Sequence, residues 1–152
     1  MHALSKTFAV VLATVILGGS MPSAVRASGT IVIHQADGSI DTYNDVDVRV
    51  LSGELFLTSE DGDGTIVVNE AACSYQGKII ICYPKAIALV QDGEANALTV
   101  KSGTIYLNYT DDAQPMSFSS AKLPAHSVVV AFTTKAGMFV TLHGRIDQVV
   151  KL

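Results

Sequence analysis

Cys73 and Cys82 are the only cysteines in a chain of 152 residues, and the sequence between them predicts a β-hairpin. Gly77 and Lys78 fit the two central positions of a tight turn, because glycine at the first of them is typical of a type II′ turn. Counting outward from this turn places Cys73 opposite Cys82 at a non-hydrogen-bonded pair, where facing side chains lie closest together. The register therefore predicts a disulfide that closes with little movement of the backbone.

The first 27 residues have the pattern of a helical secretory signal peptide. A weakly basic start precedes an apolar run over residues 7–19, and Val25 and Ala27 occupy the −3 and −1 positions of a cleavage site. The run is shorter than the ~18 residues that a spanning helix needs, so a membrane anchor is the weaker alternative. We predict cleavage after about Ala27, which leaves residues 28–152 as one periplasmic or secreted domain that does not span the membrane.

Charge excludes two classes of partner for this domain. The whole chain has 10 basic and 14 acidic residues; residues 1–27 contain two of the bases and no acid, so residues 28–152 carry 8 basic and 14 acidic residues, a net charge of −6. Nucleic acids and anionic lipid surfaces bind through clusters of Lys and Arg, which this sequence lacks.

Export also favours a bridge between Cys73 and Cys82, because disulfides persist in oxidising compartments. The alternative is two small buried thiols.

Turn-forming segments divide the rest of the chain at intervals of 10 or 15 residues, with runs rich in Val, Ile, Leu, Thr and Tyr between them. They are Asp37-Gly38, Ser52-Gly53, the run Asp61–Gly64, Gly77-Lys78, Asp92-Gly93 and Ser102-Gly103. Short segments separated in this way are typical of a β-sandwich or barrel. We predict an all-β fold, a single antiparallel sandwich that is jelly-roll-like or a rolled meander, of about ten short strands.

Two of these turns predict hairpins in which the apolar residues share one face. The facing pairs are Val50–Leu55 and Val48–Leu57 around Ser52-Gly53, and Val100–Ile105 and Leu98–Leu107 around Ser102-Gly103. Ser-Gly also precedes an alternating segment at residue 28, and such a repeat leaves a β-solenoid as the alternative fold. The Asp-Gly turns favour antiparallel reversals over stacked coils.

The pattern weakens after residue 110. Residues 111–125 predict the longest irregular connection, with a short strand near residues 116–118. Strands are expected again over residues 127–132 and 138–142, followed by a turn or bulge at His143-Gly144 and a last strand over residues 145–151. Asn108-Tyr109-Thr110 fits a glycosylation sequon, which matters only in a eukaryotic secretory pathway.

Asp61 and Asp63 alternate with glycines in a loop, a pattern that could bind a calcium ion. Asp alternating with Gly in a loop can direct several oxygens at a calcium ion. An EF-hand would need further acids and a Glu at position 72, where this chain has Ala72. A polar hairpin tip is the favoured interpretation and a weak calcium site the alternative. Asp111 and Asp112 could add ligands only if the fold brings the two loops together.

The three histidines of the predicted domain, His34, His126 and His143, do not have the spacing of a metal site. His126 precedes Ser127, but a catalytic base must reach its nucleophile in space, and adjacency in sequence does not ensure this. Asp147 could orient His143. We predict no catalytic residue, no cofactor and no enzymatic activity, with a hydrolase as a low-ranking alternative.

Asp37-Gly38-Ser39 and the run Ser52–Phe56 resemble in texture the exported jelly-roll modules of bacteria, such as the sensor domains of iron-dicitrate regulators and the periplasmic proteins of lipopolysaccharide transport. The resemblance covers only these turn segments, so we assign no family and transfer no functional residue. We expect an exported, non-enzymatic module that binds a protein or a polymer of the cell envelope. The alternative is a small β-barrel that holds an apolar ligand such as a lipid.

Overall fold

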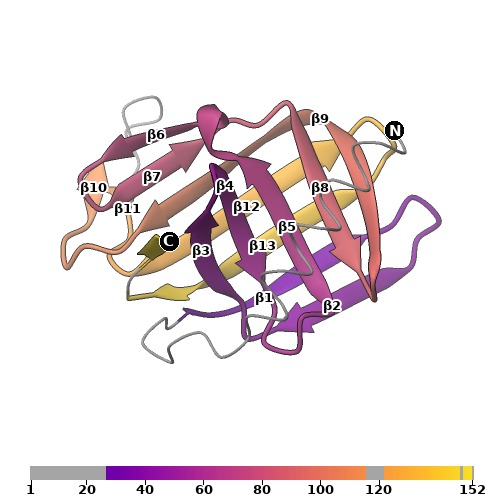
Figure 1. Ribbon diagram of the computed structural model, residues 1–152, viewed down its shortest axis with the longest axis horizontal. Helices are drawn as coiled ribbons and strands as arrows, with labels where there is room; N and C mark the ends of the chain where they lie inside the picture. Colours follow the sequence, from indigo (N-terminus) through magenta and orange to yellow (C-terminus); the bar gives the residue numbers. More distant parts are fainter. Residues whose placement is uncertain (1–26, 116–121, 148, 152) are drawn as a thin grey trace.

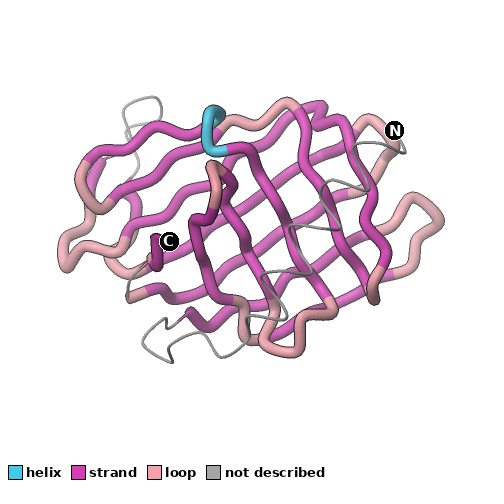
Figure 2. The backbone as a smooth tube through the Cα atoms, in the orientation of Figure 1, coloured by secondary structure: helices cyan, strands magenta, loops and turns pink. Residues whose placement is uncertain are grey.

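The computed structural model describes residues 27–115, 122–147 and 149–151, and most of them lie in β-strands (Figure 2). One short 3-10 helix, η1 (Glu70–Ala72), interrupts the strands of this described part. The fourteen strands found there are β1 Ala27–His34, β2 Ile40–Asn44, β3 Asp47–Leu51, β4 Glu54–Thr58, β5 Gly64–Asn69, β6 Cys73–Gln76, β7 Ile79–Cys82, β8 Ala86–Gln91, β9 Glu94–Asn108, β10 Gln114–Pro115, β11 Lys122–Leu123, β12 Ser127–Thr134, β13 Phe139–Ile146 and β14 Val150–Lys151.

The strands form two layers that share one strand, β9 (Figure 1). The front layer has the order β14-β3-β4-β5-β8-β9, and the back layer has the order β9-β12-β13-β1-β2, with β7 and then β6 beyond β9. Neighbours are antiparallel except for β14 and β3. Strands of the two layers cross at a wide angle in Figure 1, as in orthogonally packed sandwiches. The predicted all-β antiparallel fold is confirmed, and the sheet neither coils as a solenoid nor closes into a barrel.

Turn chemistry correctly predicts the turns at Ser52-Gly53 and Asp92-Gly93. Val50 faces Leu55 across the β3–β4 hairpin, as the alternation of apolar residues requires. Ser52 and Gly53 both have positive φ, at 53° and 79°, which a type I′ turn needs at its two central positions. The Asp92-Gly93 turn closes the β8–β9 hairpin with the same pair of positive φ angles.

The hairpin predicted around Ser102-Gly103 is wrong, because β9 continues through these residues as one strand of 15 residues. Its first part pairs with β8 in the front layer, and its second part pairs with β7 and β12 in the back layer. The pairing with β12 shifts at this point, since Thr133 faces Ser102 but Thr134 faces Val100. Ser102-Gly103 is therefore the bulge at which the strand bends from one layer into the other.

Gly103 makes this bend possible in two ways. Its φ of 155° is a conformation that L-residues rarely adopt. A Cβ at this position would also lie 2.5 Å from the carbonyl oxygen of Ala131 and 2.5 Å from Cδ1 of Phe132. The neighbouring strand thus packs directly on the glycine backbone, and a larger residue leaves no room for that approach.

The core lies between the two layers, where alternate residues of each strand point inward. Burial of each large side chain there stabilises the fold by roughly 1.5–3 kcal/mol. The largest of the fully buried side chains in this core are Phe132, Ile31, Ile33, Leu55, Leu57, Ile66, Ile80, Leu89, Ile105, Leu107 and Leu142.

Tyr43 of β2 joins the two layers at one end of the sandwich. Its ring lies so close to Gly64 of β5 that a Cβ there would be 2.3 Å from Tyr43 Cγ. Gln91 Nε2 of β8 donates a hydrogen bond to the Tyr43 hydroxyl at 3.1 Å. Burial is the main cause that raises the pKa of Tyr43.

The C-terminal part differs from the sequence expectations in two respects. His143 and Gly144 lie inside β13, where they pair with β12 on one side and β1 on the other, so they form no turn. Residues 145–146 belong to β13, and the last strand is only Val150–Lys151. The strand expected near residues 116–118 lies outside the described residues.

Replacement of Gly103 by valine should destabilise the fold by about 2–3 kcal/mol, because the side chain would overlap the β12 backbone at the bend. Urea unfolding at neutral pH measures this loss. Ser102→Ala is the matched control, since Ser102 is exposed on the same bulge and should change stability by less than about 0.5 kcal/mol. Equal stability of Gly103→Val and the parent chain would contradict the role of Gly103.

Candidate binding surface

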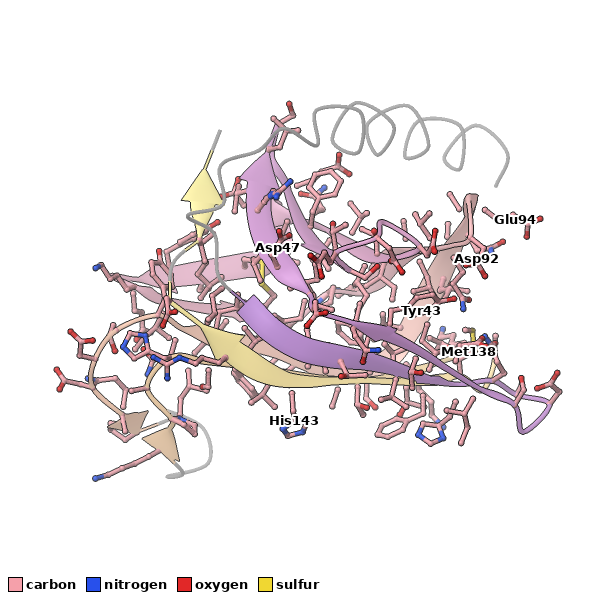
Figure 3. The ribbon with its side chains drawn as sticks, turned by 90° about the horizontal axis from the view of Figure 1, so that it is seen from below. Tyr43, Asp47, Asp92, Glu94, Met138 and His143 are labelled. Carbon is pink, nitrogen blue, oxygen red and sulfur yellow. A yellow bond between two sulfur atoms is a disulfide. The ribbon has the colours of Figure 1, made fainter. Side chains whose placement is uncertain are left out.

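The side of the back layer that faces away from the core forms a broad surface. Its residues alternate with core residues such as Ile31, Val130 and Leu142, which point the opposite way. Figure 3 shows His143 of this surface pointing away from the core. We call the central part of this surface the outer face, and we define it as Thr30, Val32, His34, Ile40, Thr42, Asn44, Ile81, Ser102, Thr104, Tyr106, Val129, Ala131, Thr133, Phe139, Thr141 and His143.

The outer face contains no Asp, Glu, Lys or Arg among these residues, although the chain has 14 acidic and 10 basic residues. Arg145 follows at its border, in the next position of β13 that points to this side. Hydroxyl-bearing, β-branched and aromatic side chains make up most of the surface. It is therefore a large neutral area on an acidic protein.

Apolar exposure is concentrated at one end of the outer face. Ile40 is 57% exposed and Phe139 is 42% exposed. The register places His34 between them, opposite Ile40 on one side and opposite Phe139 on the other. The rings of His34 and Phe139 are 5.8 Å apart. These three residues form a continuous patch across β2, β1 and β13.

Two tyrosines border the other end of the outer face. Tyr83 directly follows β7 and is 51% exposed, and its side chain is hydrogen-bonded to Tyr106 of β9. Partial burial, followed by the neighbouring Tyr106, raises the pKa of Tyr83. Ile81 faces Tyr106 across the β7–β9 pair. This end thus presents aromatic rings with hydroxyl groups, whereas the opposite end presents the apolar side chains of Ile40 and Phe139 and the imidazole of His34.

Cys73 and Cys82 form the predicted disulfide, at the predicted pairing of β6 with β7. Their Cα atoms lie 4.0 Å apart, as expected for a non-hydrogen-bonded pair. The backbone hydrogen bond from Tyr83 N to Ala72 O, at 3.0 Å, continues the ladder beyond the cysteines. The disulfide holds the hairpin that supplies Ile81 and Tyr83 to the outer face.

Asp61 is a turn-forming residue in the structure. Its carboxylate accepts hydrogen bonds from Asp63 N at 3.0 Å and from Ser59 Oγ at 2.8 Å, and these bonds, the first above all, lower the pKa of Asp61. The described residues contain no group of three or more His, Cys, Asp or Glu placed to hold a metal ion. Asp111, the proposed additional ligand, contacts His126 at 2.7 Å instead.

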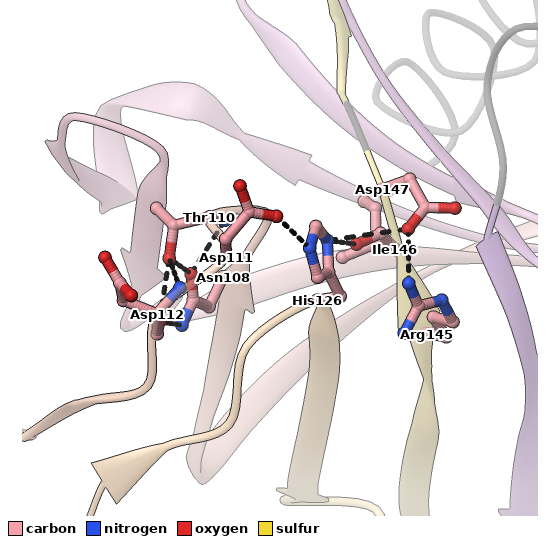
Figure 4. A network of polar contacts seen from close by, with 8 residues as sticks. All are labelled: Asn108, Thr110, Asp111, Asp112, His126, Arg145, Ile146 and Asp147. Carbon is pink, nitrogen blue, oxygen red and sulfur yellow. Dashed lines mark hydrogen bonds and ion pairs between the residues drawn. The ribbon is translucent and has the colours of Figure 1, made fainter.

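A polar network surrounds His126 at one end of the back layer (Figure 4). Its Nε2 lies 2.7 Å from Asp111 Oδ1, and its Nδ1 lies 3.4 Å from Asp147 Oδ1. Arg145 contacts the same Asp147 oxygen at 3.0 Å. The interpretation in which Asp147 orients His143 is therefore wrong, because Asp147 contacts His126 and Arg145 while His143 lies on the outer face.

The network holds a loop to the ends of two strands and contains no nucleophile–base pair among its described contacts. Ser127 Oγ donates to the carbonyl of Pro124 at 2.6 Å. Asn108, the acceptor residue of the sequon, is fully buried. Its amide donates to Asp112 O and Leu123 O and its carbonyl accepts from Thr110 N, so this side chain anchors the loop after β9 (Figure 4).

The chain has no match among known protein families, curated proteins or solved structures. Within the described residues we also find no helix whose length and apolar character would let it cross a membrane.

Loss of the disulfide should lower the free energy of unfolding by about 2–3 kcal/mol, since the bridge closes a short loop. The double variant Cys73→Ala/Cys82→Ala tests this by urea unfolding. Dithiothreitol is the control, because it should lower the stability of the parent chain and leave that of the variant unchanged. A parent chain insensitive to reductant would contradict a structural role for the bridge.

Alkaline pH should destabilise the protein. Burial is the first cause that raises the pKa of Tyr43, Tyr75, Tyr83 and Tyr109, and Glu70 raises that of Tyr75 further through a hydrogen bond. In the unfolded chain these hydroxyls lose their protons at a pH of about 10, whereas the folded chain keeps them to a higher pH. The free energy of unfolding is therefore unaffected by these groups below that pH and falls as the pH rises above it.

Urea midpoints at pH 8, 10 and 11 measure the effect. Tyr75→Phe removes one of the ionisable hydroxyls and should reduce the dependence on pH. Midpoints that stay constant up to pH 11 would contradict the prediction.

Proposed function

We propose that this protein is an exported, non-enzymatic binding module that contacts a protein or a polymer of the cell envelope through its outer face. The observation that carries this proposal is a broad face that has Arg145 at its border, no charged residue among those that define it, and the exposed side chains of Ile40 and Phe139, on a chain with 14 acidic residues. Exposed apolar side chains grouped on one surface are typical of interaction sites. The disulfide supports the oxidising compartment that export implies.

Rigidity favours binding at this surface. Thr30, Val32, Thr141 and other β-branched residues of the outer face have few side-chain conformations to lose on contact. The backbone beneath them is fixed by hydrogen bonds to strands on both sides, for example β13 between β12 and β1. A partner therefore meets a surface already in its bound conformation, which reduces the entropic cost of association.

Neutrality favours a partner with little charge. A charged group placed against the outer face would lose water and find no opposite charge among its described residues. The hydroxyls of Thr42, Thr104 and Thr141 can bond to neutral groups such as amides or sugar hydroxyls. Both classes of proposed partner, a protein surface and an envelope polymer, offer such groups.

The alternatives have less support. An apolar ligand inside a barrel would require a closed sheet, whereas the strand order ends at β14 and β2. A hydrolase would require a base beside a nucleophile, whereas His126 contacts Asp111 and Asp147 and the hydroxyl of Ser127 donates to Pro124 O. A lipid that co-purifies in native mass spectrometry would favour the first of these alternatives.

A carboxylate in the middle of the outer face should abolish binding. Ala131 is exposed on β12, and Ala131→Asp would bury an unpaired charge in the complex. We expect immobilised parent protein to retain a partner from an envelope extract or a purified cell-wall polymer, and the variant to retain at least about tenfold less.

Thr99→Asp is the matched control, because Thr99 is exposed on β9 where that strand pairs with the front layer. This variant should bind as the parent does. Retention that Ala131→Asp leaves unchanged, or a parent protein that retains nothing, would contradict the proposal.

A further inference from the structure

One row of side chains crosses the back layer at right angles to its strands. In an antiparallel sheet, residues that face each other across successive strands lie in such a line on the same side of the sheet. Each member of this row is paired with the next, from β6 at one end of the layer to β2 at the other. We call it the cross-strand row, and its members in that order are Ser74, Ile81, Tyr106, Val129, His143, Thr30 and Asn44.

The cross-strand row carries neutral polar groups at short, regular intervals. It spans six strand spacings, a length of roughly 29 Å, with one side chain every ~4.8 Å. Most of its members have a hydroxyl, imidazole or amide group, and none is Asp, Glu, Lys or Arg. Ser74, His143 and Asn44 are exposed, and Thr30 Oγ1 donates a hydrogen bond to Asn44 Oδ1 at 2.9 Å. The row can therefore form several hydrogen bonds with an uncharged partner.

The loop after β9 lies beside the cross-strand row. Asn108, two residues beyond Tyr106 on β9, points to the same side of the layer, and its amide donates to Asp112 O and Leu123 O. These two residues therefore lie over the outward side of the back layer, next to the row. Figure 3 agrees, because β10 and β11 (pale orange) lie on the side of the layer toward which His143 points. At β9 the row thus runs along the foot of a step.

The size of the outer face disfavours a protein as its partner. One residue on a sheet face covers about 33 Å², the product of the strand spacing and the two-residue repeat, so the outer face covers roughly 500 Å². A standard protein interface buries about 800 Å² on each partner. An extended peptide would bind at a sheet edge, where backbone N–H and C=O groups are open, and not across the face of paired strands.

A neutral polysaccharide matches the cross-strand row in charge, spacing and shape. Its hydroxyl groups exchange hydrogen bonds with hydroxyl, amide and imidazole side chains and need no opposite charge. A linear chain of pyranose rings advances by a distance close to one strand spacing per ring, so successive rings can meet successive side chains. The C–H groups of a sugar ring also pack on aromatic rings, and Tyr83, 51% exposed and hydrogen-bonded to Tyr106, supplies such a ring beside the row.

We propose that the cross-strand row binds a neutral, linear polysaccharide of the cell envelope, which lies extended across the strands. Tyr83 packs on one sugar ring, and Tyr106, His143 and Asn44 form hydrogen bonds with rings further along the chain. This inference rests on the proposed function, because it names the partner of the outer face. It goes further in selecting a polysaccharide over a protein and in assigning the direction in which the polymer lies.

Titration calorimetry with defined glycans tests this proposal. The probes are linear hexasaccharides of glucose, of mannose and of N-acetylglucosamine, and a hexasaccharide of galacturonic acid is their anionic counterpart. We expect at least one neutral probe to bind the disulfide-bonded protein. The galacturonate probe should bind at least about tenfold more weakly, because its carboxylates would lose water and meet no positive charge in the row.

Two exposed members of the row provide the variants. Asn44→Ala and His143→Ala should each weaken binding of the neutral probe by at least about threefold, which corresponds to the loss of one hydrogen bond. Asn96→Ala is the matched control, because Asn96 is exposed on β9 where that strand pairs with β8 in the front layer, and it should bind as the parent does. Circular dichroism of each variant verifies its fold.

The proposal would be overturned if no neutral probe bound, if the galacturonate probe bound equally well, or if both row variants bound like the parent. The envelope-extract experiment separates this failure from a failure of the proposed function. A protein that the parent retains and Ala131→Asp loses, together with no glycan binding, rejects the polysaccharide alone. A parent that retains nothing from the extract and binds no glycan rejects both proposals.

Discussion

The architecture depends on the bend in β9. A strand of 15 residues pairs with β8 in one layer and with β7 and β12 in the other, so the two layers form one continuous hydrogen-bonded sheet. The bend needs a residue without a side chain, because Ala131 and Phe132 of β12 lie directly on the backbone of Gly103. Interlayer packing of the apolar side chains follows from this crossing. Tyr43, packed on Gly64, fixes the relative position of the layers at one end.

Folding one sheet into two layers gives each layer a side that faces away from the core, and the two sides differ in chemistry. The outward side of the back layer presents neutral hydroxyl and aromatic groups, whereas the corresponding side of the front layer carries Phe56, Val67, Ala88 and Val90 beside the ion pair of Arg49 with Asp47. Acidic residues are found largely in the turns, as at Asp37, Asp61, Asp63 and Asp92.

The sequence alone identified features that depend on residues close together in the chain. It missed features that depend on pairing between strands far apart in the chain. The Cys73–Cys82 register follows from one turn, and the structure reproduces it. Ser52-Gly53 and Ser102-Gly103 are the same dipeptide before similar strands, yet the first reverses the chain and the second only bends it. The difference lies in the pairing of residues 100–108 with β12, which no local pattern encodes. The contacts of His126 with Asp111 and Asp147 were missed for the same reason, since they require β9, β12 and β13 to be adjacent.

The disulfide has a local task within this architecture. The hairpin β6–β7 lies at the end of the back layer, and only β7 pairs with the rest of the sheet, over four residues with β9. Strands at the end of a sheet separate most readily, because they have neighbours on one side only. Because a covalent bond joins β6 to β7, β6 cannot separate from the sheet unless β7 separates with it. Ile81 and Tyr83 thereby keep fixed positions beside Tyr106, and the outer face extends across the full width of the back layer as one rigid surface.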